Sequence, residues 1–260
     1  MTIFTTFNDK MYLATGKDLL QSIRETLPAA GVILYEEFNS VKATELCTPW
    51  CNTLISIKSL KSVKEVLRNN KDIIPKAYGG DSSGAVGDKF WNYRWFGWFK
   101  KVAMAHHALC VKDFTSDFGG YFIFVDSDIR FKKGFGDDTI RKLMNGRPIG
   151  FFKGNRPEID SGFIAIDSCS IQPEKFYNYF MNLFLSGSFR DEPRWDDIWL
   201  MTRLVEACPK EWFHDFAEGQ VANKHTNSNG HTTVNQIIPF SEMSEYIEHD
   251  KGLHVRNNIS

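Results

Sequence analysis

The sequence has 260 residues, of which 42% are hydrophobic and 24% are charged. This length and composition are those of a globular protein with one large domain, or two small ones, and a sizeable buried core. The formal net charge of −1 excludes the global positive field of a protein that wraps nucleic acid.

The first residues lack a basic stretch followed by an apolar one, and no apolar run approaches the ~20 residues that span a bilayer. We therefore expect a cytoplasmic protein with neither a signal peptide nor a membrane span. Five cysteines, an odd number, are scattered through the chain, as is typical of reduced thiols. Cys47 and Cys51 form a C-x3-C pair, but no second pair accompanies them, so we expect them to pack in the core instead of binding zinc.

Apolar runs and helical spacings alternate from the N-terminus onward. Strands are predicted at 2–7, 31–35, 121–125, 149–153 and 162–167, and helices at 10–27, 57–67, 94–110, 176–185 and 195–205, with a loop at 72–88. This alternation predicts the α/β class: a single domain whose central mixed, mostly parallel sheet is flanked by helices.

The predicted helix at 94–110 is rich in aromatic residues. Its apolar positions, Trp95 and Trp98 among them, recur at the spacing of one helical face, which indicates a core helix. Lys100 and Lys101 lie on the same helix, where they could reach the phosphates of a ligand or form a solvated face, and we favour the solvated face. His106 and His107 are interpreted as structural or solvated residues, not as metal ligands.

In the stretch YFIFVDSD, residues 121–128, a fully apolar predicted strand is followed directly by two carboxylates. Ligands of α/β sheets bind outside the carboxyl ends of the strands, which is where Asp126 and Asp128 are expected. Two carboxylates that close repel each other unless a cation lies between them, and oxygen ligands favour Mg²⁺ or Mn²⁺. The pattern therefore predicts a metal site that can hold a diphosphate.

Two other metal-dependent sites share this pattern. A calcium-binding EF-hand loop that began at Asp126 would need glycine at its sixth position and glutamate at its twelfth, where the chain has Phe131 and Asp137. That interpretation fails. A haloacid-dehalogenase-type phosphatase, with Asp126 as nucleophile, stays as an alternative, although its motif has Thr or Val where this chain has Arg130.

Five short segments in the same order resemble the GT-A-fold glycosyltransferases, which carry a D-x-D motif and use nucleotide-sugar donors, and in particular the glycogenin and bacterial galactosyltransferase group. These segments are FTTFN at 4–8, FVDSD at 124–128, DSGFIAID at 160–167, WDDIWL at 195–200 and HDKG at 249–252. The third segment has Asp-Ser where that group has Asn-Ala, so its sugar contacts are expected to differ.

The resemblance implies a Rossmann-related GT-A domain with a nucleotide-binding half at 1–130. The other half, at 131–260, would bind the acceptor and end in a tail for metal and diphosphate. It also implies a UDP- or GDP-sugar donor and Mn²⁺ or Mg²⁺ as cofactor. The implied metal ligands are Asp128, Asp126 (directly, through water, or instead through the ribose hydroxyls) and His249. The implied donor-binding residues are Thr5, Thr6, Phe7, Arg94, Asp126, Ser127, Lys251 and Gly252. His254 and Arg256 are alternates in the tail, and either His249 or His254 would complete the metal shell.

The candidate catalytic residues are Asp197, then Asp196, then Asp160. Acidic residues favour a helix N-terminus because of the helix dipole, so one of the adjacent pair is expected to cap its helix. The other would deprotonate the acceptor hydroxyl in an inverting enzyme, or stabilise positive charge on the sugar ring in a retaining one. Asp160 would hold sugar hydroxyls.

The resemblance leads to a metal-dependent glycosyltransferase as the expected function, with an acceptor hydroxyl on a glycan, a protein or a hydroxylated DNA base. A non-catalytic module that binds sugar or nucleotide is a further alternative. Nothing in the sequence identifies the donor sugar, the stereochemical course or the oligomeric state.

Overall fold

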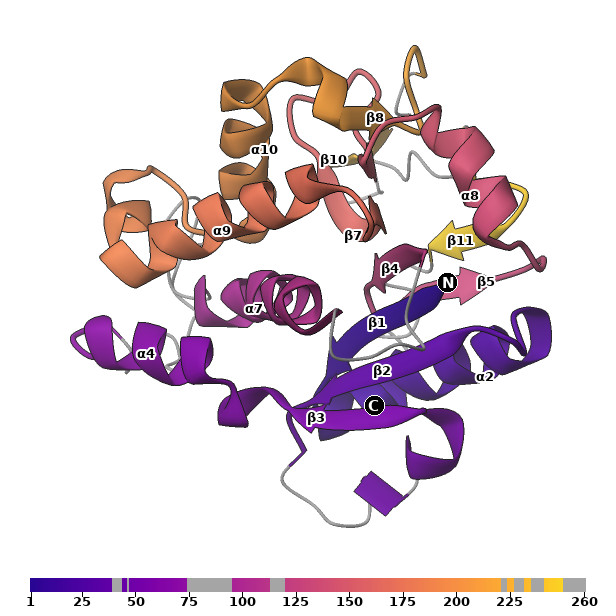
Figure 1. Ribbon diagram of the computed structural model, residues 1–260, viewed down its shortest axis with the longest axis horizontal. Helices are drawn as coiled ribbons and strands as arrows, with labels where there is room; N and C mark the ends of the chain where they lie inside the picture. The colour runs from indigo at the N-terminus through magenta and orange to yellow at the C-terminus, as the bar shows by residue number, and fades with distance from the viewer. Residues whose placement is uncertain are drawn as a thin grey trace.

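The computed structural model describes residues 1–38, 44–45, 47–73, 95–112, 120–220, 224–226, 232–234 and 241–249. Its centre is a seven-stranded sheet in the order β3-β2-β1-β4-β7-β6-β8 (Figure 1). These strands are β1 (Thr2–Phe7), β2 (Gly31–Glu36), β3 (Thr53–Ser56), β4 (Tyr121–Val125), β6 (Ile149–Phe152), β7 (Asp160–Asp167) and β8 (Phe213–Asp215). Two small two-stranded sheets pair β5 (Ile129–Phe131) with β11 (Ile247–His249), and β9 (Lys224–Thr226) with β10 (Thr232–Val234).

The first four strands run parallel to one another, whereas β7 runs antiparallel to both β4 and β6. The sheet is therefore mixed and mostly parallel, as predicted. Strand β1 pairs with β2 on one side and with β4 on the other. The strands that follow β1 in the sequence are therefore added first on one side of it, as β2 and β3, and then on the other, as β4. In doubly wound α/β sheets a ligand crevice opens beyond the carboxyl ends of the strands at such a switch point.

Helices cover both faces of the sheet (Figure 1). They are α1 (Asp9–Met11), the π-helical turn η1 (Tyr12–Gly16), α2 (Lys17–Thr26), α4 (Lys61–Asn69), α7 (Trp95–Val111), α8 (Asp137–Met144), α9 (Ile171–Ser186) and α10 (Asp197–Ala207), with short 3₁₀ turns η2 (Thr48–Trp50), η3 (Ile57–Ser59), η5 (Ser188–Asp191) and η6 (Lys210–Trp212). The side chains of α4, α7, α9 and α10 share one apolar core with the sheet, and those of α2 and α8 share the other. None of the helices in the described ranges is long and apolar enough to cross a bilayer.

Most predicted elements are confirmed, with ends that differ by a few residues. The predicted helix at 10–27 is divided into α1, η1 and α2, and the predicted helix at 57–67 into η3 and α4. Strand β3 and helix α8 were not predicted. β3 is a four-residue edge strand whose side chains are all only half-buried, so it lacks the apolar run that identifies β4. The predicted loop at 72–88 lies almost wholly outside the described residues.

Cys47 and Cys51 flank the 3₁₀ turn η2 and are free thiols. Burial raises the pKa of each thiol to about 12, so both stay protonated at neutral pH. Thiolates, not thiols, bind zinc and attack disulfides, and this environment therefore favours the packing role expected from the sequence.

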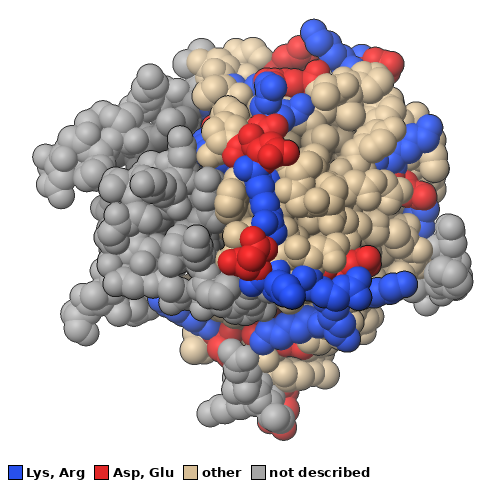
Figure 2. Space-filling view, turned by 90° about the vertical axis from the view of Figure 1, so that its left-hand side faces the viewer, with Lys and Arg blue, Asp and Glu red and all other residues tan. Residues whose placement is uncertain are grey.

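The amphipathic helix α4 shows how charge is placed on this fold. Val63 and Val66 are buried in the core that α4 shares with α7 and α9, whereas Lys61, Lys64 and Arg68 are exposed. Figure 2 looks onto the side of the molecule where α4 lies, and Lys and Arg form a nearly continuous band across the lower part of that face. The chain as a whole is close to neutral, so this band is a local concentration of positive charge.

Helix α10 begins at a buried, fully satisfied cap. Asp196 accepts a hydrogen bond from the Trp199 backbone N–H at 3.1 Å, and Arg194 binds both of its carboxylate oxygens at 2.9 and 3.1 Å. Arg194 also pairs with Glu158. The cap satisfies an orphan N–H of the first helical turn, and it fixes where the next residue, Asp197, enters the interior.

We predict that Asp196→Ala lowers the free energy of unfolding by about 3 kcal/mol, because it removes the cap and leaves the guanidinium of Arg194 without its main partner. The matched control is Asp138→Ala, which breaks an exposed pair with Arg141 and should cost under about 1 kcal/mol. Urea denaturation at constant m-value measures both. Equal midpoints for the two variants would contradict the structural role given to Asp196.

Candidate functional site

Asp126 stands at the switch point between β1 and β4. The all-buried strand β4 ends at Val125, and the Asp126 backbone N–H then donates to the Gly162 carbonyl of β7 at 2.8 Å. The Ile129 N–H in turn donates to the Asp126 carbonyl at 3.1 Å, which closes a tight turn around the D-x-D residues. The backbone of this segment is therefore fixed on both sides, and its carboxylates are presented at the expected edge of the sheet.

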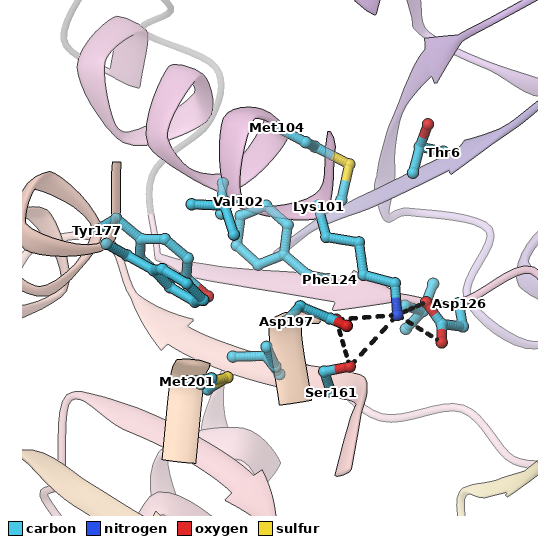
Figure 3. Close-up of a pocket in the computed structure, with 14 residues that line it drawn as sticks. Thr6, Lys101, Val102, Met104, Phe124, Asp126, Ser161, Tyr177, Asp197 and Met201 are labelled. Atoms are coloured by element: carbon cyan, nitrogen blue, oxygen red, sulfur yellow. Dashed lines mark hydrogen bonds and ion pairs between the residues drawn. The ribbon is translucent and has the colours of Figure 1, made fainter. Parts of the chain in front are cut away.

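The ammonium of Lys101 occupies the centre of the site (Figure 3). Its Nζ lies 2.7 and 2.9 Å from the two carboxylate oxygens of Asp126, and 3.3 Å from Asp197 Oδ2. It also donates to Ser161 Oγ at 3.3 Å and lies over the ring of Trp98. A single cation thus connects helix α7 with the end of β4, with β7 and with the start of α10.

Asp197 is buried, with a residue exposure of 2%. Its Oδ2 accepts a hydrogen bond from Ser161 Oγ at 2.6 Å, but its Oδ1 has no hydrogen-bond partner among the described residues. A buried carboxylate oxygen without a partner is costly, and native structures keep such atoms where a water molecule or a ligand completes them. Asp197 Oδ1 therefore marks a place where the site can accept a hydroxyl group.

Opposite charges decide the electrostatics of this cluster. Burial alone lowers the pKa of Lys101, but the carboxylates of Asp126 and Asp197 raise it well above its ordinary value. Lys101 is therefore a permanent cation at neutral pH. Burial also raises the pKa of the nearby Tyr177 phenol, and the charge of Asp197 raises it further, so that its hydroxyl stays protonated and able to donate.

Asp128 contacts His249, the last residue that the structure describes. Strand β11 pairs antiparallel with β5, immediately after the D-x-D turn, and this register places His249 opposite Ile129. The His249 Nε2 and Asp128 Oδ1 atoms are 3.1 Å apart. His249 is buried, and its Nδ1 has no hydrogen-bond partner within the described ranges. The assignment of these two residues to a metal site stays a prediction.

The residues fit a divalent cation by their chemistry, because two carboxylates and an imidazole are ligands that Mn²⁺ accepts. Gly162 is closely packed at this point: a Cβ there would lie 3.0 Å from Asp160 Oδ1, 3.2 Å from His249 Cε1 and 3.5 Å from Asp126 Oδ2, so a larger residue would crowd these side chains. Within the described residues, however, no three His, Cys, Asp or Glu side chains are already gathered around one point. Asp126 faces Lys101, so a cation would have to share or take over that carboxylate.

An enclosed cavity of about 20 Å³ lies beneath the cluster, lined by Thr6, Lys101, Asp126, Ser161, Tyr177 and Asp197 among others (Figure 3). This volume holds a water molecule and not a sugar ring. A larger ligand therefore has to lie on the outer side of Asp126, whose side chain is 31% exposed, or to displace the side chain of Lys101.

The three predicted nucleotide-binding residues of β1 alternate in direction. Thr5 and Phe7 are buried, and Phe7 stacks on Tyr12 at a centroid distance of 5.8 Å. Thr6 faces the cavity, and its hydroxyl donates to the Tyr35 carbonyl at 2.7 Å. Ser127 is buried and accepts a hydrogen bond from Thr15 Oγ1 at 2.9 Å. Only Thr6 of the three therefore presents a side chain to the cluster, and nucleotide binding by these residues stays a prediction.

The remaining candidate carboxylates have distinct surroundings. Of the adjacent pair, Asp196 caps α10 as expected for one member, and Asp197 joins the cluster. Asp160 is buried beside Asp126, where it binds Arg156 at 3.0 Å and accepts the Gly162 N–H. The other predicted donor-site residues, Arg94, Lys251, Gly252, His254 and Arg256, and the glycine-rich segment at 79–87 lie outside the described residues.

The interpretation of Lys100 and Lys101 as a solvated face was wrong. Lys101 is the central cation of the cluster, and Lys100 pairs with Glu37 and lies over the ring of Phe96. Ser161, which orients Asp197, was not predicted either. Helical spacing identified the apolar face of α7 but carries no signal for which of two adjacent lysines points at carboxylates from β4 and α10.

Comparison with known proteins bears on the fold. No protein-family model matches the chain, and no curated protein matches its sequence. Among solved structures, the apo form of mouse xyloside xylosyltransferase 1 matches with a TM-score of 0.51 and 12% identity, over 83% of this chain and 85% of that one. The bifunctional glycosyltransferase WbbM (TM-score 0.43, 12% identity) and the glycosyltransferase GlyE of Streptococcus pneumoniae (TM-score 0.45, 8% identity) match 82% and 84% of this chain.

This chain covers only 37% of WbbM and 45% of GlyE, whereas it covers most of the mouse enzyme. At these identities the likeness concerns the course of the backbone and not the chemistry of individual side chains. Together with the seven-stranded mixed sheet and its switch point, it identifies the fold of this chain as the GT-A-like fold of glycosyltransferases.

Proposed function

We propose that the protein is a metal-dependent glycosyltransferase that moves a sugar from a nucleotide-diphosphate donor, a UDP- or GDP-sugar, to an acceptor hydroxyl. The observation that supports this most directly is the cluster at the switch point, where Asp126, Lys101 and Asp197 meet at the edge at which such sheets bind their ligands. The GT-A-like fold supports the same reaction class, and both metal binding and the donor are part of the proposal.

Asp126, Asp128 and His249 are the residues that would hold Mn²⁺ or Mg²⁺. When bound, such an ion offsets the charge of a diphosphate and stabilises the departing nucleotide. Lys101 contributes a fixed positive charge beside Asp126, and its three hydrogen-bonded partners keep it in one orientation. A donor phosphate placed on the outer side of Asp126 would therefore meet a cation that needs no reorganisation.

Asp197 is the residue proposed to act on the sugar or on the acceptor. Ser161 and Lys101 both bind its Oδ2, so the carboxylate is held in one orientation and its Oδ1 is left to interact with a ligand. That oxygen can accept a hydroxyl proton as a general base, or face positive charge on the sugar ring. We therefore propose that Asp197 takes part in the chemistry, whereas the neighbouring Asp196 caps the helix.

The phosphatase alternative requires Asp126 to attack phosphorus. Both oxygens of that carboxylate lie within 2.9 Å of Lys101 Nζ, and this pairing favours a charge-balancing role over a nucleophilic one. Beryllium fluoride separates the two functions experimentally: a phosphatase forms a trapped aspartyl adduct at Asp126, and the proposed transferase does not.

We predict that UDP or GDP raises the melting temperature in the presence of Mn²⁺ by about 5 °C at saturation, since a ligand that binds only the folded state stabilises it. Asp128→Ala should abolish the Mn²⁺-dependent part of the shift, whereas the exposed Asp138→Ala should keep it. Differential scanning fluorimetry with and without EDTA makes the comparison. The metal assignment is wrong if Asp128→Ala shows the shift of the wild type.

We predict that Asp197→Asn lowers kcat by at least about a hundredfold with little change in KM for the donor, because the amide can neither accept a proton nor carry negative charge. The amide keeps the size of the side chain, so the melting temperature should stay within a few degrees. Release of the free nucleotide from the donor reports turnover. A variant that keeps kcat within threefold of the wild type would remove Asp197 from the mechanism.

We predict that Lys101→Met raises the affinity for Mn²⁺ and lowers the rate of turnover. Removing the ammonium leaves Asp126 and Asp197 without their counter-ion, so Mn²⁺ should bind about tenfold more tightly, while turnover falls about a hundredfold. Lys100→Met, which changes the adjacent residue and its pair with Glu37, is the matched control and should alter neither quantity by more than about twofold. Mn²⁺ binding is measured by electron paramagnetic resonance. Unchanged affinity in Lys101→Met would show that the ammonium and the ion do not compete for Asp126.

A further inference from the structure

A second depression lies away from the site, between the outer surfaces of α4, α9, α10 and η6. It is a groove of about 970 Å³, far larger than the cavity beneath Lys101. Its walls combine the aromatic residues Tyr179 and Trp212 with leucines, the amides of Asn69 and Asn182, two serines and Glu65. Large concave sites with apolar walls and a few converging polar groups are the usual places for ligands.

One face of α9 forms the floor of this groove. Tyr179, Asn182, Leu183 and Ser186 follow the i, i+3, i+4, i+7 spacing of a single helical face, and all four line the groove. The opposite face of α9, which carries Phe176, Phe180 and Phe184, packs into the core. Tyr179 is 52% exposed, so a large aromatic side chain is offered to solvent beside an amide and a hydroxyl.

This combination suits a carbohydrate. A pyranose ring has a face of C–H groups, which packs on an aromatic ring, and a rim of hydroxyl groups, which exchange hydrogen bonds with amides, hydroxyls and carboxylates. Tyr179 and Trp212 supply the aromatic surfaces, and Asn69, Asn182 and Glu65 supply polar groups of both kinds.

Helix α4 lines the groove with Glu65 and Asn69, and it also carries a basic stripe on its exposed surface. Lys61, Lys64 and Arg68 recur at helical spacing and form an exposed stripe about 10 Å long on α4, and the exposed Lys71 follows shortly after the helix. Lys61, Lys64 and Lys71 have no acidic partner in the described part of the chain, and Arg68 approaches the groove residue Glu65 at 3.7 Å. A ligand seated in the groove therefore meets positive charge along one side.

We propose that this groove binds an acidic oligosaccharide, whose ring faces pack on Tyr179 and Trp212 and whose carboxylate or phosphate groups lie against the basic stripe of α4. The inference rests on the proposed function in one respect: the bound glycan is taken to be the acceptor. Helix α10 links the two places, since Asp197 opens the helix at the site and Ala207, ten residues and about 15 Å further on, lines the groove. The ligand that spans both is a chain of several sugars.

The structure favours a glycan over two other polyanions. A nucleic acid would place phosphates along its whole backbone inside the groove, where the only charged residue of the described lining is Glu65, whereas a glycan can place its neutral ring faces there and its acidic groups outside, against the basic stripe. An anionic membrane requires a convex or flat face, whereas the groove is concave, and the apolar residues Val63 and Val66 of α4 are buried instead of being available for insertion. Both remain outcomes of the test.

The experiment measures binding of hexagalacturonate, a carboxylated hexasaccharide, by isothermal calorimetry, with maltohexaose as its neutral counterpart. The wild type should bind the acidic sugar more tightly, with an affinity that falls as salt rises. Tyr179→Ala should weaken binding of both sugars about tenfold, and Lys61→Glu combined with Lys64→Glu should weaken only the acidic one, also about tenfold. Both variants change exposed side chains, and their melting temperatures confirm folding.

Matched controls lie elsewhere on the surface. Leu13→Ala changes an exposed apolar residue far from the groove, and Lys132→Glu combined with Lys142→Glu reverses two exposed charges on the other side of the sheet; neither should alter binding. The proposal is overturned if these controls weaken binding as much as the groove variants do. It is equally overturned if oligothymidylate or vesicles of phosphatidylglycerol and phosphatidylcholine bind in place of the acidic sugar.

The same measurement in the Asp128→Ala background separates this inference from the proposed function. Sugar binding that persists there, even if no nucleotide-sugar is ever turned over, supports the groove as a glycan site. Loss of sugar binding in the groove variants, with donor hydrolysis unchanged, gives the same support from the opposite direction. Intact transferase activity without any binding of hexagalacturonate would remove the groove and leave the transfer proposal standing.

Discussion

One ammonium group holds the site together. Lys101 Nζ is within hydrogen-bonding or ion-pair distance of Asp126, Asp197 and Ser161, and these three residues come from segments that are far apart in the sequence. Without this cation, two carboxylates would face each other in a largely water-excluded place, where like charges are strongly unfavourable. The requirement to balance these charges constrains where α7, the end of β4 and the start of α10 can lie relative to one another.

Hydrogen bonds fix the backbone where β4 ends and where α10 begins, and this satisfies the constraint. Strand β4 is buried on both faces and delivers Asp126 into a turn whose backbone is bonded to β7, and the Asp196 cap fixes the first turn of α10 so that Asp197 points inward. The late strand β11 returns to β5 and brings His249 to Asp128. Asp126, Asp197 and His249 therefore stand at or next to the termini of helices or strands, and Lys101 lies within α7, so packing determines their positions better than a long loop would.

Charged residues gather in two separate places, one around Lys101 and one on the exposed surface of α4. The near-neutral total hides a partly buried cluster of one ammonium and two carboxylates and, elsewhere, the exposed basic stripe of α4 beside an aromatic groove. A buried cluster of mixed charge suits chemistry on a charged donor, because its groups are already oriented. An exposed stripe of lysines is screened by salt and suits recognition of a flexible, charged chain. The two features belong to different steps of one proposed reaction.

The sequence by itself determined the α/β class, the strand that leads into the D-x-D motif and the core face of α7, because apolar periodicity and a short motif are local properties. The contact of His249 with Asp128 joins residues 121 positions apart and belongs to the tertiary structure. The sequence did not determine that Lys101 is the central cation, that Asp196 caps while Asp197 enters the cluster, or that α4, α9 and α10 enclose a groove. Adjacent residues such as Lys100 and Lys101, or Asp196 and Asp197, have nearly the same local context. Which of them faces inward depends on helix rotation and on partners 25 to 96 positions away, as Lys101 with Asp126 and with Asp197 shows, and only tertiary packing decides that.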